Sequence, residues 1–216
     1  MGALRIRYQT IEIENIDIHV MTLRDNQQFS DPEGVASRLG ISSAIWPLFG
    51  IIWDSGEVLA HIMFDYEIEG KRILEVGCGI ALASLVLNHR LADITATDYH
   101  PEAESFLRKN VKLNNGPAIP FLRTAWEDEN NSLGGFDLII GSDLLYERGH
   151  AVDLSSFIDQ HSKLHCDVII VDPGRGQSAK FSKEMIEFGY DLNEDEPGRR
   201  NFLSDKGNGR ILHYHR

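Results

Sequence analysis

One short stretch of the chain holds an acidic residue, two glycines and a second acidic residue at a spacing that suits a nucleotide-like ligand. Glu75 is followed by Gly77 and Gly79, and Asp98 comes nineteen residues after Gly79. Glycine lets the backbone turn sharply and approach a ligand without a clash of Cβ atoms. A carboxylate at the spacing of Asp98 is placed to accept hydrogen bonds from ribose hydroxyls. We therefore expect these four residues to belong to one ligand site.

The segments around these residues have the pattern of a strand, a turn, a helix and a second strand. The run Ile73–Val76 is mostly apolar and predicts a short strand. Dense apolar residues over Ala81–Leu87 predict a helix that packs on a sheet, and Ile94–Thr97 predicts the strand that ends at Asp98. Pro101 suits the first turn of a further helix. This order is typical of a doubly wound α/β domain, which binds its ligand at the carboxyl ends of parallel strands.

The residue after the glycine turn separates two classes of cofactor. A dinucleotide-binding turn needs a small residue three positions after its second glycine, whereas this chain has Leu82 there, which disfavours an NAD-dependent oxidoreductase. The segment instead resembles the E/D-x-G-x-G-x-G motif of the seven-strand, class I methyltransferases, with Ala81 in place of the third glycine. The resemblance implies S-adenosyl-L-methionine as the cofactor, with Glu75 near its methionine amino group and the turn of Gly77 and Gly79 beneath it.

Two tryptophans strengthen this resemblance and narrow it. The segment Trp53–Ala60 resembles the W-D-S/A-x-x-x-L-A motif of the family-16 methyltransferases, which include many protein-lysine methyltransferases. That likeness implies that Trp53 borders the cofactor. Trp126 follows a third expected strand, where the family places a tryptophan against the adenine. A flat apolar ring is a suitable neighbour for adenine. Tyr99, directly after Asp98, is expected among the cofactor contacts as well.

A third motif implies where the methyl group is transferred. The segment Gly141–Tyr146 resembles the G-A-D-x-x-Y motif of the same lysine methyltransferases, with serine at the alanine position. The resemblance implies that Ser142 contacts the cofactor and that Asp143 and Tyr146 face the methyl-accepting nitrogen. Val171–Arg175 further resembles the D-P-G-R segment of the mitochondrial flavoprotein-directed lysine methyltransferases and their bacterial relatives. These likenesses imply a protein lysine as the acceptor.

The family resemblance implies a fold as well as a cofactor. We expect an α/β protein with a Rossmann-like, doubly wound, seven-stranded and mostly parallel sheet, an antiparallel last strand and a small N-terminal β extension. Alternating apolar and polar residues predict short antiparallel strands over Arg5–Gln9, Thr10–Glu14 and Asp17–Thr22. Residues 1–45 are therefore assigned to this extension and a linker, and residues 46–216 to the S-adenosylmethionine-binding methyltransferase domain.

The remaining elements follow from apolar runs and turn residues. Further strands are predicted at Ile119–Thr124, Phe136–Gly141, Asp167–Val171 and Arg210–His215, the last after a turn at Gly207–Gly209, and helices are predicted from about Asp54 and over Pro101–Leu113, Ala151–Leu164 and Ala179–Phe188.

Composition limits the partners and the compartment. The 216 residues carry a net charge of −12, which argues against nucleic acid as the main partner and favours a basic one. The chain has neither a long apolar run nor a leader pattern, so we expect no membrane span and no signal peptide. Two cysteines, Cys78 and Cys166, favour a reducing, cytoplasmic setting. No cysteine and histidine spacing indicates a metal site, and the oligomeric state is left open.

Three functional hypotheses follow. The first is an S-adenosylmethionine-dependent N-methyltransferase that acts on a protein lysine, in which Asp143 orients the amine and Tyr146 forms a wall of the acceptor channel. The second is a small-molecule N-methyltransferase acting on a nicotinamide-like amine. The third is a cofactor-binding interaction protein without catalysis. An open, acidic rim around Asp143 would favour the protein substrate, and a closed pocket would favour a metabolite.

Overall fold

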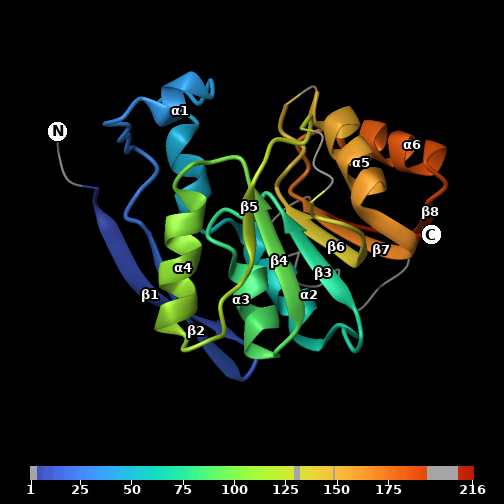
Figure 1. The fold of residues 1–216 in the computed structure, drawn as a ribbon, viewed down its shortest axis with the longest axis horizontal. Helices are drawn as coiled ribbons and strands as arrows, with labels where there is room; N and C mark the ends of the chain where they lie inside the picture. The colour runs from blue at the N-terminus through green and yellow to red at the C-terminus, as the bar shows by residue number, and fades with distance from the viewer. Residues whose placement is uncertain (1–3, 129–131, 148, 194–208) are drawn as a thin grey trace.

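The computed structural model describes residues 4–128, 132–147, 149–193 and 209–216, and its centre is one seven-stranded sheet (Figure 1). The strands run in the order β5-β4-β3-β6-β7-β9-β8. In chain order they are β3 (Arg72–Val76), β4 (Asp93–Asp98), β5 (Phe121–Arg123), β6 (Phe136–Ser142), β7 (Ser162–Asp172), β8 (Asp191–Asn193) and β9 (Arg210–His215). In the described part of the chain, no helix is long and apolar enough to cross a membrane.

The direction of the strands confirms the predicted fold. Strand β3 is parallel to both β4 and β6, and β5 and β7 continue the parallel pairing outward. Strand β9 is antiparallel to both β7 and β8. The sheet is therefore mostly parallel with an antiparallel last strand, and its order reverses at β3, as in other doubly wound folds.

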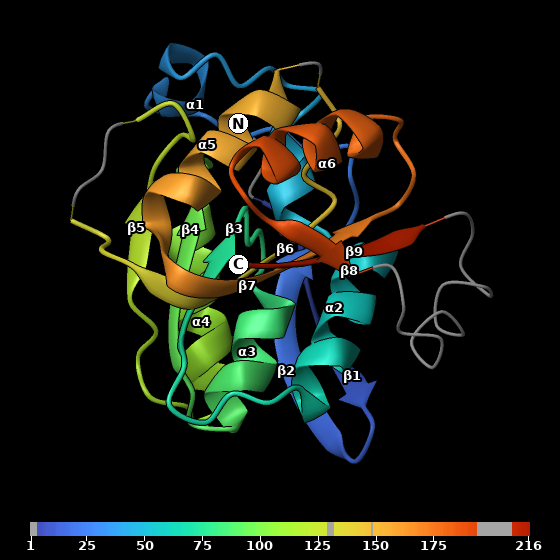
Figure 2. The same cartoon turned by 90° about the vertical axis from the view of Figure 1, so that its right-hand side faces the viewer.

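Helices cover both faces of this sheet (Figure 2). They are α2 (Asp54–Asp65), α3 (Leu82–His89) and α4 (Ala103–Leu113) on one side and α5 (His150–His161) and α6 (Ser178–Glu187) on the other. Neighbouring strand residues serve opposite layers: Ile73 packs in the core with α2 and α3, whereas Leu74 packs in the core with α5 and α6. Strands buried on both faces have nearly continuous apolar sequences, which is why the central strands could be predicted.

A separate two-stranded sheet lies beside α4. It consists of β1 (Ile6–Ile13) and β2 (Ile16–Leu23), which pair along their whole length. The backbone N–H of Met21 donates to Asn110 Oδ1 at 2.7 Å, and Asn110 Nδ2 donates back to the Met21 carbonyl at 3.3 Å. The strands predicted over Arg5–Gln9 and Thr10–Glu14 form one continuous strand, β1. It ends only at the turn, where Glu14 has a φ of 52°. The proposed boundary after residue 45 stays a prediction.

Between this hairpin and α2, the chain forms two short helices, α1 (Val35–Arg38) and the 3₁₀ helix η1 (Trp46–Gly50). Trp46 is buried and packs edge-on against Phe49, with ring centroids 5.4 Å apart. This segment packs beside the carboxyl end of β4, where His100 stacks on Phe49. The irregular segment thus supplies one wall at the end of the sheet.

Several element boundaries differ from the predictions. The helix predicted over Ala151–Leu164 ends at His161, because Ser162 begins β7 and pairs with Phe136. Strand β7 is accordingly longer than predicted, and β5 is shorter. The strand over Arg210–His215 is confirmed. Of the turn predicted before it, residues 207 and 208 lie outside the described residues.

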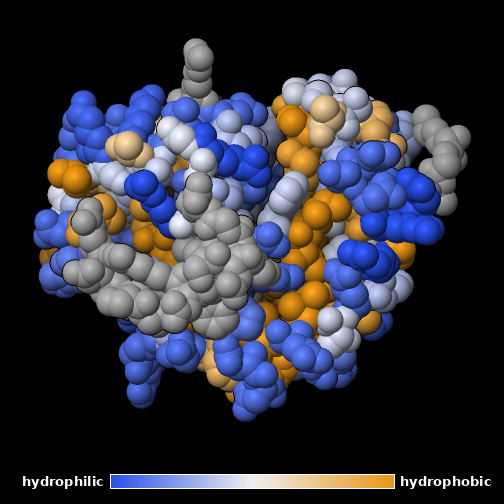
Figure 3. All heavy atoms as spheres, turned by 180° about the vertical axis from the view of Figure 1, so that it is seen from behind, coloured by the Kyte–Doolittle hydropathy of each residue, from blue (hydrophilic) through white to orange (hydrophobic). Residues whose placement is uncertain are grey.

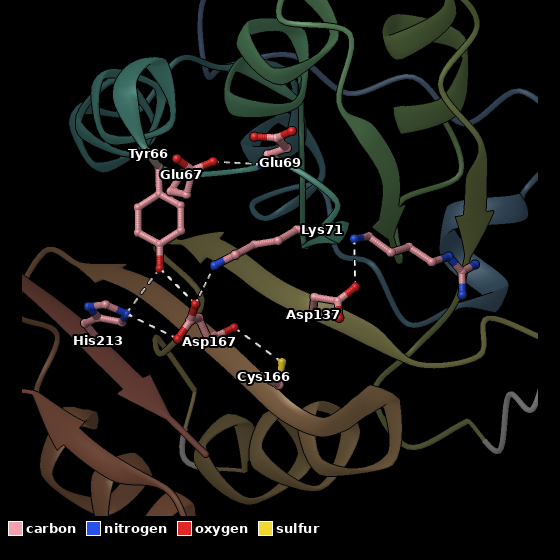
Figure 4. Close-up of polar contacts among 9 residues, drawn as sticks. Tyr66, Glu67, Glu69, Lys71, Asp137, Cys166, Asp167 and His213 are labelled. Carbon is pink, nitrogen blue, oxygen red and sulfur yellow. Dashed lines mark hydrogen bonds and ion pairs between the residues drawn. The ribbon is translucent and has the colours of Figure 1, made fainter.

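At the amino ends of the strands, ion pairs and hydrogen bonds tie neighbouring elements together (Figure 4). Lys71 Nζ lies 2.7 Å from Asp167 Oδ2, and the hydroxyl of Tyr66 donates to the same oxygen at 3.2 Å. Asp137 Oδ2 accepts from the backbone N–H of Arg72 at 2.8 Å and from Lys163 Nζ at 2.7 Å. Asp137 and Asp167 therefore each have a lysine beside them.

Candidate active site

A cleft of about 560 Å³ lies at the carboxyl ends of β3, β4 and β6, between these strand ends and the segment that contains η1. All ten residues predicted for the site line it: Trp53, Glu75, Gly77, Gly79, Asp98, Tyr99, Trp126, Ser142, Asp143 and Tyr146. The fold thus brings together residues from four separate motifs, although their contacts with a ligand stay predictions.

The glycine turn is shaped by its protein neighbours as well as by the cleft. Gly77 and Gly79 have φ angles of 59° and 55°, which disfavour other residues. A Cβ atom on Gly79 would lie 2.8 Å from the carbonyl oxygen of Phe49, a contact that real Cβ atoms do not make. Glycine at this position therefore allows η1 to close against the turn and complete the wall of the cleft.

Ala81 occupies the position where the family motif has its third glycine, and its backbone is also left-handed, with φ of 63°. It stands directly before α3 and accepts the hydrogen bond from the N–H of Leu85 at 2.9 Å. A left-handed conformation costs a residue with a Cβ about 1–2 kcal/mol. The backbone of the motif is thus kept although the glycine is replaced, and the turn stores strain at this point.

Glu75 lies under the turn and is 4% exposed. One of its carboxylate oxygens accepts hydrogen bonds from the backbone N–H of Ser84, at 2.9 Å, and from the Ser84 hydroxyl. Burial raises the pKa of Glu75 to about 7, against the lowering effect of Ser84, and the nearby Asp98 raises it further. Glu75 therefore fixes the first turn of α3 and keeps a carboxyl group at the cleft, with no cation bonded to it among the residues that the structure describes.

Asp98 holds the glycine turn from the other side. Its Oδ2 accepts the backbone N–H of Gly79 at 2.7 Å, and its Oδ1 accepts the backbone N–H of His100 at 2.7 Å. Burial raises the pKa of Asp98, although these backbone hydrogen bonds oppose the shift. Each carboxylate oxygen keeps a second lone pair, so the role predicted for Asp98 toward a ribose is compatible with its structural one.

The aromatic residues predicted for the cofactor lie in three different settings. Trp53 stands directly before α2 and donates from Nε1 to the Leu48 carbonyl at 3.0 Å. Trp126 is half-buried, and its ring meets His150 edge-on at 5.0 Å. Tyr99 donates its hydroxyl proton to the Leu39 carbonyl at 2.7 Å, which ties the end of β4 to the N-terminal segment. All three rings are thus fixed by the protein at the edge of the cleft.

The end of β6 presents Ser142 and Asp143. Asp143 has a φ of 54°, and its backbone N–H donates to the Val171 carbonyl of β7 at 2.9 Å. Its carboxylate is held by Arg175, whose Nε and Nη2 lie 2.5 and 2.6 Å from the two oxygens. Tyr146 is 49% exposed, and its ring meets His150 edge-on at 4.6 Å. Burial, with neighbouring carboxylates, raises the pKa of Tyr146 to about 12.

The structure adds cleft residues that the motifs did not predict. His100 is buried against Phe49, with ring centroids 3.9 Å apart, and burial lowers its pKa to about 3, so the imidazole is neutral. Exposed acids, Glu127 and Glu147, lie on the rim of the cleft. Arg175 belongs to the D-P-G-R segment, but the motif gave no signal for its contact with Asp143. His100 could have been suspected only because it follows Asp98 by two positions.

The surface around the cleft is open. On the side that carries the N-terminal hairpin, the rear face is hollowed, and apolar side chains line the hollow between hydrophilic ones (Figure 3). A smaller hollow of about 310 Å³ shares Ile51, Ile52 and Trp53 with the cleft. Among the described residues, no group of histidine, cysteine and acidic side chains is arranged to hold a metal ion.

Comparisons with known proteins agree with this arrangement. The sequence model of a family described as lysine methyltransferase matches residues 47–187. The calmodulin-lysine N-methyltransferase of Arabidopsis thaliana is 28% identical over 158 residues, which cover 66% of this chain and 52% of that protein. Protein N-lysine methyltransferase METTL21A of Danio rerio is 34% identical over 118 residues, 50% of each protein. The chain thus spans about half the length of the curated relatives it matches.

Solved structures show the same fold at low sequence identity. A putative methyltransferase in complex with S-adenosylhomocysteine aligns with a TM-score of 0.65 and 12% identity, over 97% of this chain and 56% of that one. The shared architecture of the sheet places that protein and this chain in the same fold class.

Proposed function

The chain belongs to the lysine methyltransferase family, and we propose that it transfers a methyl group from S-adenosylmethionine to a lysine side chain of a protein. The observation that carries this proposal is the convergence of the acidic glycine turn and the Asp143–Tyr146 segment on one cleft. The named relatives, two protein-lysine methyltransferases, support the acceptor. Because the chain spans only about half of their length, the relatives support a protein lysine as the substrate, and its assignment to this chain is our proposal.

The cofactor half of the cleft fits the chemical groups of S-adenosylmethionine. Glu75 and Asp98 are buried carboxylates with raised pKa values, and neither has a cation as a hydrogen-bond partner in the described part of the chain. We assign Glu75 to the methionine ammonium, Asp98 to the ribose hydroxyls and Trp126 to the adenine. Trp53, Tyr99 and Ser142 complete the walls. When bound, the cofactor supplies a methyl group that its sulfonium makes electrophilic.

The acceptor half is suited to an amine that enters from outside. Asp143 lines the cleft directly after the carboxyl end of β6. A carboxylate there can accept an N–H of the amine and orient its lone pair. Tyr146 is half exposed beside it, and a tyrosine ring attracts a cationic head group to its face. The exposed carboxylates of Glu127 and Glu147 give the rim a negative potential, which favours a basic protein surface over a small neutral metabolite.

The wider setting of this function is also proposed. A net charge of −12 disfavours nucleic acid as a substrate. Cys78 and Cys166 are both buried free thiols, which supports a reducing compartment such as the cytoplasm. We assign catalysis to residues 46–216 and leave the oligomeric state unassigned.

The test uses the purified protein, methyl-labelled S-adenosylmethionine and a cytoplasmic extract. We expect labelled protein bands that disappear with Asp143→Asn. They should persist with Asp137→Asn, which makes the same chemical change at the opposite end of the sheet. Label confined to small molecules would replace the protein substrate with a metabolite. Tight binding of S-adenosylhomocysteine without any labelling would contradict the proposed enzyme activity and favour a cofactor-binding protein without catalysis.

A further inference from the structure

The loop after β7 contributes one cation to the lining of the cleft, and this cation is already bound to the acid proposed to face the substrate. Arg175 and Asp143 are 32 residues apart in the chain and come from the ends of neighbouring strands. The guanidinium contacts both carboxylate oxygens, at 2.5 and 2.6 Å. A two-point contact of this kind fixes the plane of the carboxylate as well as its position.

Burial and backbone geometry on the Asp143 side distinguish this contact from an ion pair between two exposed side chains. The Asp143 side chain is 9% exposed, whereas that of Arg175 is 43% exposed. Asp143 has a left-handed backbone, which is held in place by the hydrogen bond from its N–H to the Val171 carbonyl. The backbone of Asp143 is thus held by Val171, and its carboxylate is held by Arg175, the more exposed partner of the pair.

The charge of the pair bears on the chemistry of the acceptor. A lysine must lose its proton before its nitrogen can attack a methyl group. A free carboxylate beside the amine would stabilise the ammonium and hold it in the unreactive form. Arginine keeps its charge at all accessible pH values, so it neutralises Asp143 throughout. Two bonds from Arg175 still leave lone pairs on the carboxylate that can accept an N–H of a neutral amine.

We propose that Arg175 is a positioning residue that clamps Asp143 and cancels its charge, so that the site takes the acceptor lysine as a neutral amine. This inference rests on the proposed function and adds a residue to it. Arg175 acts through Asp143 and does not itself touch the reacting atoms.

Other ionisable groups surround the Asp143–Arg175 pair and contribute to the electrostatic potential there. Asp172 ends β7 beneath the loop, and burial raises its pKa, opposed by the backbone N–H groups of Gly174 and Arg175. Tyr146 faces the pair from the segment after β6, and the charges of Asp98 and Glu147 act in turn on Tyr146. With these acids around it, Asp143 would present an ammonium-binding site if Arg175 were removed.

The experiment compares Arg175→Ala and Arg175→Lys in the methylation of the protein that the wild type labels in the extract. Rates are measured from pH 6 to 10 at saturating S-adenosylmethionine. For Arg175→Ala we expect kcat to fall about tenfold at pH 7.5 and KM to fall rather than rise. The midpoint of the rise in kcat with pH should move up by about one unit, because the ammonium is now stabilised.

Arg175→Lys separates charge from geometry. It keeps the positive charge but loses the two-point contact, so we expect a lower kcat with an unchanged midpoint. Added methylguanidine should return the midpoint of Arg175→Ala toward that of the wild type. Arg108→Ala, which removes an exposed arginine paired with Glu104 on α4, is the matched control and should change nothing.

The outcomes are distinct. An unchanged midpoint in Arg175→Ala, with kcat reduced, would mean that the arginine merely supports the loop, and would overturn the inference while the wild-type activity stands. A wild type that labels no protein would overturn the proposed function, and this inference with it. Affinity for S-adenosylhomocysteine should stay within twofold in every variant, because Arg175 lies on the acceptor side.

Discussion

The two ends of the central sheet treat buried and half-buried carboxylates in opposite ways. At the amino end, burial would raise the pKa of Asp137, but hydrogen bonds from Lys163 and the Arg72 backbone outweigh it and lower the pKa. At the carboxyl end, burial dominates and raises the pKa values of Glu75 and Asp98. The sheet thus carries paired acids at its amino end. At its carboxyl end, Glu75 and Asp98 lack a cation as hydrogen-bond partner in the described part of the chain, although Asp143, which lines the same cleft, is paired with Arg175.

This difference shows which carboxylates stabilise the folded protein and which destabilise it. Paired acids favour the folded state at neutral pH, whereas a buried acid without a cation destabilises it. Backbone strain does not follow the same division. Asp143 lines the cleft and Ala81 stands between two residues that do, but Glu14, Leu91 and Asn115 have left-handed backbones elsewhere in the molecule. Matched substitutions at the two ends of the sheet test this contrast.

The largest effect is expected at the acceptor side. Asp143→Asn should reduce kcat about a thousandfold, because the amide orients the amine poorly and leaves Arg175 without its anion. Affinity for S-adenosylhomocysteine, measured by calorimetry, should change less than twofold. An equal loss of turnover and cofactor affinity would show that Asp143 supports the cofactor site instead. Asp137→Asn is the matched change at the amino end and should leave kcat intact.

The next effect is a pH dependence of stability that originates at Glu75. Its pKa is raised from 4.5 to about 7 in the folded protein, so the folded state binds a proton that the unfolded state releases. Stability from this group is complete below about pH 4.5 and is lost as the pH rises through about 7, by up to roughly 3 kcal/mol. Glu75→Gln should flatten this part of the curve of unfolding free energy against pH, as measured by urea denaturation. An identical slope in both proteins would contradict the assignment.

Asp98→Ala should weaken the binding of S-adenosylhomocysteine about thirtyfold. The substitution removes the proposed ribose contact and also leaves the backbone N–H groups of Gly79 and His100 without their acceptor. Titration calorimetry measures the affinity, with Asp137→Ala as the control at the amino end. A normal affinity in Asp98→Ala would remove this residue from the cofactor site.

A smaller effect is expected where charges are paired. Lys71→Met removes the cation from Asp167, although Tyr66 still donates to that carboxylate. Because both side chains are partly exposed, the free energy of unfolding should fall by only about 1 kcal/mol. Chemical denaturation measures this loss, and the methylation rate should be unchanged. A reduced methylation rate at full stability would show that the two ends of the sheet are coupled.

The smallest effect concerns strain beside the cleft. Ala81→Gly should raise the free energy of unfolding by about 0.5 kcal/mol, since relief of the left-handed strain exceeds the added entropy of the unfolded chain. Gly149, which precedes α5, gives the contrast: its φ is an ordinary −78°, so Gly149→Ala should introduce no left-handed strain. A less stable Ala81→Gly variant would mean that the alanine methyl contributes packing that outweighs the strain.

The sequence was sufficient for the fold because its central strands are buried on both faces. The run Leu138–Gly141 is apolar without interruption, and the strand over Phe136–Gly141 was predicted with nearly the bounds that the structure has. The start of β7 was missed because the predicted helix was continued through Leu164. The residues from Lys163 onward alternate between polar and apolar, but Lys163, Leu164 and His165 are all exposed, so no buried face marks the strand there. Local pattern predicts a strand only where the strand meets the core.

The site was predictable to the extent that its residues lie in short motifs. The contact between Asp143 and Arg175 depends on the pairing of β6 with β7, which no local spacing encodes. The wall supplied by η1 was missed for a related reason: it packs on the turn through the Phe49 carbonyl, and a backbone atom carries no sequence signal. Motifs predict which residues gather at a site, whereas topology decides how they pair.

The position of β9 has a consequence for the order in which the protein folds. This strand pairs on one side with β7 and on the other with β8, yet both precede it in the chain. During synthesis, β7 therefore exposes an unpaired edge until β9 has been made, and β8 has no strand to pair with. Unpaired edges are sites of intermolecular association. The nascent chain thus depends on late insertion of a single strand to complete the sheet beneath the Arg175 loop.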